Sequence, residues 1–129
     1  MASPMVTPLR RVLGLGSAHE GTMHHWRQRL TGLSNLILIS GFIVLIVALL
    51  GRPYPDVIAI LGHPLVAVWL LLMVISISVH MRIGVQIVIE DYVHGHTRKH
   101  LLLILNTFFT IAVAAVSVFA ILRIAFGVA

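Results

Sequence analysis

The chain of 129 residues contains no cysteine. It therefore forms no disulfide, and acting alone it offers no thiol nucleophile, no ligand set for an iron–sulfur cluster and no thiolate zinc site. Internal repeats and low-complexity tracts are also missing from the sequence. The apolar composition, described next, favours one domain with no separate soluble module.

The chain also has few charged residues. Only 10% of the residues are charged whereas 59% are hydrophobic, and the mean hydropathy is +1.04. A chain this apolar would aggregate in water unless lipid covered it. The net charge of +5 is spread over segments that flank the apolar stretches, where positive charge sets topology and does not indicate nucleic-acid binding. The composition predicts an integral membrane protein.

Three apolar stretches are long enough to cross a membrane, since about 20 residues span ~30 Å of hydrocarbon. They cover residues 30–50, 64–89 and 101–122. The expected fold is all-α, with three transmembrane helices in a membrane-anchor domain of residues 21–129. Residues 1–20 are expected to form a flexible cytoplasmic tail.

Prolines mark the connection between the first two stretches. Pro53 and Pro55 forbid continuation of the first helix. Pro64 suits the first turn of the second helix, where its missing N–H would be unpaired anyway. Residues 57–61 are too few to span the bilayer, so we expect a short amphipathic turn at the surface.

Basic residues predict the orientation through the positive-inside rule. They are concentrated before the first span and after the second, at Arg10, Arg11, Arg27, Arg29, Arg98 and Lys99. The opposite side carries only Arg52, balanced by Asp56, and Arg123. The amino terminus and the second loop are therefore expected in the cytoplasm, and the carboxyl terminus outside.

His80 is the ionisable group that stands deepest in an apolar helix. Such groups are costly in a membrane and mark functional sites. A neutral imidazole is a strong ligand for iron, and Ser76 and Gly84 lie four residues either side, on the same helix face. A glycine there removes the side chain that would strike a flat macrocycle. The alternative is that His80 hydrogen-bonds to a neighbouring helix and that Gly84 is a packing position.

Asp91 and Tyr92 follow His80 by eleven and twelve residues. Eleven residues make about three helical turns, so Asp91 lies near the His80 face and roughly 16 Å along the helix. A tyrosine hydroxyl can donate a hydrogen bond to a quinone carbonyl, and an acid can relay protons. The alternative is an interfacial tyrosine anchor beside a solvated acid.

Two arginines have open roles. Arg82 lies ~200° around the helix from His80 and could pair with a cofactor carboxylate or a partner's acid, or could snorkel to the interface. Arg29, at the start of the first span, is explained by topology alone. A haem propionate would also suit it, because arginine binds carboxylates bidentately.

Other histidines cluster near the cytoplasmic side, at His24, His25, His94, His96 and His100. No carboxylate or cysteine accompanies them at ligand spacing, so polar surface loops are favoured over a metal site. No second histidine lies at membrane depth. A six-coordinate haem would therefore need its other axial ligand from another chain.

The segment from Ser78 to His94, SVHMRIGVQIVIEDYVH, resembles the small hydrophobic membrane-anchor subunit of bacterial succinate dehydrogenase, respiratory complex II. In that family a His, a Gly four residues later and an Asp-Tyr pair occupy the second of three spans. The stretch from Trp26 to Thr31 resembles the family's segment before the first span. The resemblance covers residues 20–126 and is closest to alphaproteobacterial and mitochondrial members.

The resemblance implies roles for individual residues. His80 matches an axial ligand of haem b, whose other ligand comes from the larger cytochrome b subunit. Tyr92 matches the tyrosine that hydrogen-bonds to ubiquinone, and Asp91 its neighbour. Arg29 matches an arginine near the haem propionates, whereas Arg82 has no ligand counterpart in the enteric members. The implied partners are that cytochrome b subunit, an iron–sulfur subunit and a flavoprotein, and the implied location is the bacterial inner membrane.

Two alternatives stay open. The first is the anchor of a fumarate reductase or of a haem-free variant, in which the direction of electron flow differs. The second is a stand-alone three-span channel or assembly protein, in which His80 only packs between helices.

Overall fold

The fold was described from a computed structural model, which describes residues 18–127 of the chain and the side chains of residues 23–127. Within this range the chain forms four helices and no strand. They are α2 (Ala18–Leu49), α3 (Tyr54–Leu61), α4 (Pro64–Tyr92) and α5 (His96–Ala125). The predicted all-α fold is confirmed. Most of the predicted tail, with Arg10 and Arg11, lies outside the described residues.

Three of the helices are long and apolar enough to cross a membrane, which confirms the three predicted spans. Their spanning parts are Met23–Leu49, Pro64–Tyr92 and His96–Ala125. Helix α2 begins at residue 18, well before the predicted apolar stretch at 30–50. The helices extend past the apolar stretches because backbone hydrogen bonding does not stop where the hydrocarbon ends.

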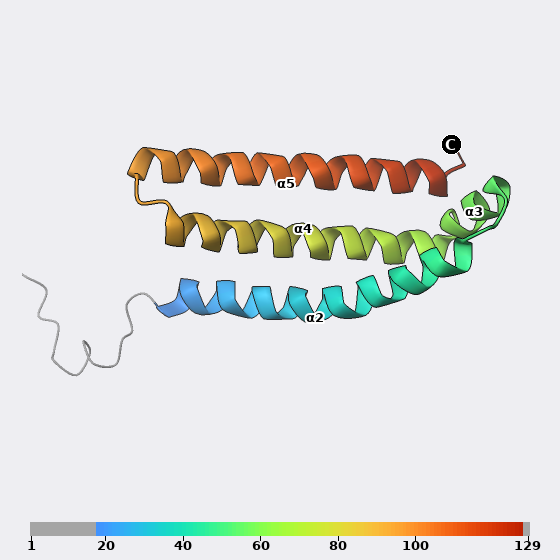
Figure 1. The fold of residues 1–129 in the computed structure, drawn as a ribbon, viewed down its shortest axis with the longest axis horizontal. Coiled ribbons are helices and arrows are strands. Elements are labelled where there is room, and N and C mark those ends of the chain that lie inside the picture. The colour runs from blue at the N-terminus through green and yellow to red at the C-terminus, as the bar shows by residue number, and fades with distance from the viewer. Residues whose placement is uncertain (1–17, 128–129) are drawn as a thin grey trace, which may run out of the picture.

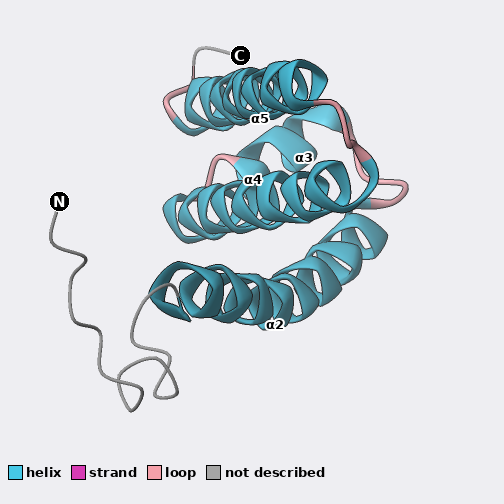
Figure 2. Ribbon diagram, turned by 90° about the vertical axis from the view of Figure 1, so that its left-hand side faces the viewer, coloured by secondary structure: helices cyan, strands magenta, loops and turns pink. Residues whose placement is uncertain are grey.

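The three long helices lie side by side in one layer, with α4 in the middle (Figures 1 and 2). Consecutive long helices run in opposite directions. The short helix α3 lies at the same end of the layer as the last turn of α5 and packs against α4 and α5. Helix α4, which carries the predicted site residues, therefore has a helix on each side.

The connection from α2 to α4 differs from the predicted turn at 57–61. It contains α3, a helix of eight residues that begins directly after Pro53. Gly51 adopts a left-handed conformation with φ of 76°, which suits the chain reversal after α2. Pro55 stands in the first turn of α3, where proline is well tolerated. The prolines thus end one helix and start another.

Helices α2 and α4 approach each other closely at Gly41. A Cβ atom on Gly41 would lie 2.7 Å from Cζ2 of Trp69, so a larger residue would require the indole to move. On the other side of α4, the amide of Asn106 donates a 3.0 Å hydrogen bond to the Arg82 carbonyl. Asn106 is buried, and this bond joins α5 to α4.

A single layer of helices has little interior. The buried apolar side chains in the described part of the chain all belong to α4, at Ala67, Leu70, Met73, Ile83 and Ile89. Large apolar side chains are exposed along all three long helices. Such surfaces are stable only against lipid or another protein, which agrees with a membrane protein.

Candidate functional site

His80 lies in the middle helix and faces α2. Its side chain is half-buried, and its Nδ1 atom is 3.1 Å from the hydroxyl oxygen of Thr31. A Cβ atom on Gly32 would lie 3.5 Å from His80 Cε1, which is ordinary van der Waals contact. Thr31 and Gly32 therefore form the surface of α2 on which the imidazole rests.

The other ring nitrogen of His80, Nε2, has no hydrogen-bond partner among residues 23–127. Two side-chain atoms in this range are fully enclosed and lack a partner, Gln28 Oε1 and Asn35 Oδ1, and Nε2 of His80 is not among them. The imidazole is thus anchored at one nitrogen and open at the other. That is the arrangement of a histidine that binds a metal through its second nitrogen.

Ser76 and Gly84 share the α2-facing side of α4 with His80, as the spacing predicted. The Ser76 hydroxyl is 3.5 Å from the Thr31 carbonyl oxygen, one turn from the imidazole. At Gly84, a Cβ atom would lie 3.4 Å from Nε2 of Gln28. Gly84 thus makes room for the Gln28 side chain of the same chain. Helix packing at Gly84 and a hydrogen bond from His80 to a neighbouring helix are therefore both present.

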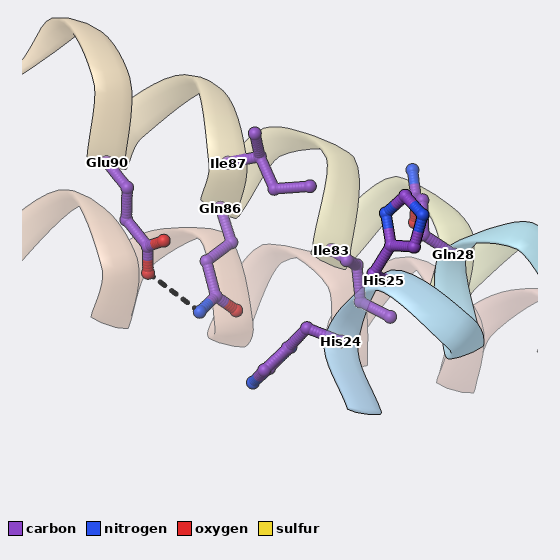
Figure 3. Close-up of a pocket in the computed structure, with 7 residues that line it drawn as sticks. All are labelled: His24, His25, Gln28, Ile83, Gln86, Ile87 and Glu90. Carbon is purple, nitrogen blue, oxygen red and sulfur yellow. Dashed lines mark hydrogen bonds between the residues drawn. The ribbon is translucent and has the colours of Figure 1, made fainter. Parts of the chain in front are cut away.

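A pocket of about 490 Å³ opens between the start of α2 and the end of α4 (Figure 3). Most of its lining side chains are polar, and the amide of Gln86 donates a 2.9 Å hydrogen bond to Glu90. The lining residues are His24, His25, Gln28, Ile83, Gln86, Ile87 and Glu90. Sequence reasoning missed this pocket. The signal was polar spacing of three and four residues on both helices, which only antiparallel pairing brings together.

Asp91 and Tyr92 stand at the last turn of α4, and both are exposed. The Tyr92 side chain is 79% exposed and forms no hydrogen bond within residues 23–127. The helix is continuous from His80 to Tyr92, so the two sites are about three turns apart on one rigid element. Lys99 of α5 reaches this end of α4, where its Nζ atom donates a 3.2 Å hydrogen bond to the Glu90 carbonyl.

The two arginines of interest are exposed as well. Arg29 on α2 and Arg82 on α4 form no ion pair with any described residue. No group of three or more His, Asp or Glu side chains in the described range could hold a metal ion. A metal ion held by this part of the chain would therefore need further ligands from a cofactor or another chain.

Two comparisons with known proteins bear on identity. Residues 3–120 match the family described as the succinate dehydrogenase/fumarate reductase transmembrane subunit. The chain is also 36% identical over 122 residues to the succinate dehydrogenase hydrophobic membrane anchor subunit of Paracoccus denitrificans, covering 95% of this chain and 94% of the relative. No solved structure matches the chain.

The matched region includes the first two spans, most of the third and every candidate site residue on them. The chain is thus a multi-pass membrane protein, and its likeness to the Paracoccus subunit agrees with the predicted bacterial inner membrane. The family match also confirms the resemblance that the Ser78–His94 segment indicated. The chain belongs to the family of transmembrane subunits of succinate dehydrogenases and fumarate reductases.

Proposed function

We propose that this chain is the hydrophobic anchor of a succinate:ubiquinone oxidoreductase, in which it supplies one axial ligand of haem b and part of the ubiquinone site. One observation supports the proposal above the others. His80 is half-buried at membrane depth between two helices, with Nδ1 held by Thr31 and Nε2 without a partner in the described chain. An unpaired ring nitrogen is what an iron ligand requires.

The residues around His80 fit such a ligand. The imidazole is seated against Thr31 and Gly32, which restricts its orientation before any cofactor binds. Haem b, when bound, supplies one-electron redox chemistry. His80 is the single histidine within the predicted spans, so the second axial ligand belongs to a cytochrome b subunit that packs against the exposed apolar surface.

Two exposed arginines near the level of His80 would complete this half of the cofactor site. Arg29 is exposed at the start of the apolar part of α2 and is free to bind a haem propionate. Arg82, also exposed, projects from a different side of α4 and would pair with a propionate or with an acidic group of the partner subunit.

Asp91 and Tyr92 are assigned to ubiquinone. The Tyr92 hydroxyl would donate a hydrogen bond to a quinone carbonyl, and Asp91 would pass protons from the water phase to the reduced ring. Both side chains are exposed at the end of α4, at the face where a flavoprotein and an iron–sulfur subunit would dock. Electrons from succinate would reach the quinone there, and this subunit would not oxidise succinate by itself.

The test is a matched pair of variants in the whole complex, measured in native membranes. His80→Ala is expected to abolish or shift the reduced-minus-oxidised haem b spectrum. His94→Ala removes an exposed imidazole from the loop after α4 and should leave the spectrum unchanged. An unaltered spectrum in His80→Ala would refute the ligand assignment.

A fumarate reductase anchor is the second candidate, because the matched family contains both enzymes. The direction of electron flow depends on the potentials of the quinone and of the clusters in other subunits. The quinone that co-purifies with the complex distinguishes the two. A ubiquinone supports the proposal, whereas a quinone of much lower potential supports fumarate reduction.

A further inference from the structure

The hydroxyl oxygen of Thr31 lies within hydrogen-bond distance of three groups. It lies 2.8 Å from the carbonyl oxygen of Arg27 and 3.2 Å from that of Gln28, both on the preceding turn of α2. The third neighbour is Nδ1 of His80 at 3.1 Å. The position of one proton decides which ring nitrogen of His80 can bind a metal.

Counting protons settles the direction of each hydrogen bond. A threonine hydroxyl has a single proton and further acceptor capacity, while a carbonyl oxygen can only accept. The hydroxyl proton is therefore directed to the carbonyls of Arg27 and Gln28. The remaining lone pair of the hydroxyl faces His80, so Nδ1 must be the donor in the third hydrogen bond.

We propose that Thr31 is the positioning residue that fixes the tautomer of His80, with the proton on Nδ1 and the free electron pair on Nε2. This inference rests on the proposed role of His80 as a haem ligand and deepens it. Hydrogen bonds from Thr31 to the preceding turn of α2 set the direction of its hydroxyl group. The hydroxyl in turn fixes which nitrogen of the His80 ring carries the proton. Thr31 has no contact with the iron in this assignment and acts only through His80.

The surroundings hold this arrangement in register. A Cβ atom added to Gly32 would reach His80 Cε1 at 3.5 Å, so the glycine lets the ring lie close to α2 beside Thr31. The hydroxyl of Ser76 approaches the carbonyl of Thr31, which links α4 to the same turn of α2. The contact between Thr31 and His80 is thus part of the interhelical packing.

The hydrogen bond also has an electronic consequence. Donation from Nδ1–H to an oxygen makes the imidazole a stronger electron donor at Nε2. A stronger donor stabilises ferric haem relative to ferrous haem and keeps the midpoint potential low. Loss of the Thr31 hydroxyl is therefore expected to raise the midpoint potential.

The experiment compares Thr31→Ser, Thr31→Ala and Thr31→Val in the intact complex by redox titration of the haem b spectrum. Serine keeps the hydroxyl, alanine and valine remove it, and valine keeps the size of threonine. The potential should be unchanged in Thr31→Ser and should shift upward in both other variants. Thr107→Val is the matched control, because Thr107 donates the same kind of bond to the Leu103 carbonyl on α5, away from His80.

The pattern of shifts decides between a hydroxyl effect and a size effect. Equal potentials in all Thr31 variants, or a shift in Thr31→Ser as large as in Thr31→Ala, would overturn the tautomer assignment. The proposed function would survive that result if His80→Ala still abolished the haem spectrum. Conversely, an unaltered haem spectrum in His80→Ala refutes the ligand assignment on which this inference rests.

A second measurement covers variants that fail to assemble. Nitrogen NMR of the wild-type complex, labelled with ¹⁵N-histidine and with its haem in the diamagnetic low-spin ferrous state, reports the protonation of His80 directly. His80 should show a protonated Nδ1. A His80 ring without that proton would contradict the assignment to Thr31, whatever the protonation of the partner's ligand.

Discussion

Helix α4 carries two candidate sites, and other residues of this chain contact the first much more than the second. His80, in the middle of the helix, is half-buried and is fixed by Thr31 and Gly32 of α2. Tyr92, about three turns further on, is 79% exposed and is held by no hydrogen bond from the described chain. The interior site is organised within this subunit, whereas the rim site is only presented by it.

The medium explains the contrast. A polar side chain at membrane depth has no water to bind, so the chain must satisfy it internally. At the rim, water satisfies Asp91 and Tyr92 until a partner arrives. It follows that the haem half-site should be sensitive to changes in α2, and that the quinone half-site should depend on the docked subunits.

Breaking the interior site alone gives the largest expected effect. In Gly32→Leu, atoms beyond Cβ would enter the space of the His80 ring, because a Cβ alone already reaches 3.5 Å from Cε1. Overpacking of this kind costs about 1–3 kcal/mol and would displace the imidazole. We expect strong loss of haem b absorbance per assembled complex, with succinate oxidation by a soluble dye preserved.

Gly32→Ala is the control for that variant. Its Cβ fits at contact distance, and alanine favours a helix over glycine by about 1 kcal/mol. The haem spectrum should therefore stay as in the wild type. Equal haem loss in both variants would mean that the contact between Gly32 and His80 does not govern the site.

The sequence was sufficient for the fold and for the separation of the two sites. The lengths of the apolar stretches predicted three spans, and the positions of His80 and Asp91 on one helix predicted their spacing. Both are properties of a single segment, which periodicity encodes. The orientation across the membrane remains a prediction.

The partners of His80 could not be predicted in the same way. Thr31 meets His80 across 49 residues of sequence, and Gln28 meets Gly84 only because α2 and α4 pair at a particular register. Helix periodicity gives the faces but not the register. The pocket beside His24 and Glu90 was missed for the same reason.

The rim site is tested by Tyr92→Phe, where a smaller effect is expected. The substitution removes one hydroxyl from an exposed ring and disturbs no packing in this chain. Loss of one hydrogen bond to the quinone, worth about 1 kcal/mol, should slow quinone reduction roughly five- to tenfold. Succinate oxidation by an artificial soluble dye should be unaffected. Equal loss of both activities would assign Tyr92 to assembly instead.

The smallest effect is expected at Arg29, which lies between the two regions along the membrane normal. Its positive charge near a propionate favours the reduced haem, so Arg29→Leu should lower the midpoint potential, opposite in sign to Thr31→Ala. The shift should be small because Arg29 is exposed and water and salt screen its charge. Arg29→Lys keeps the charge but loses the bidentate fork, so its midpoint potential should fall between those of the wild type and Arg29→Leu. A potential that Arg29→Leu leaves unchanged would restrict Arg29 to setting topology, and a rise would place its charge outside the haem site.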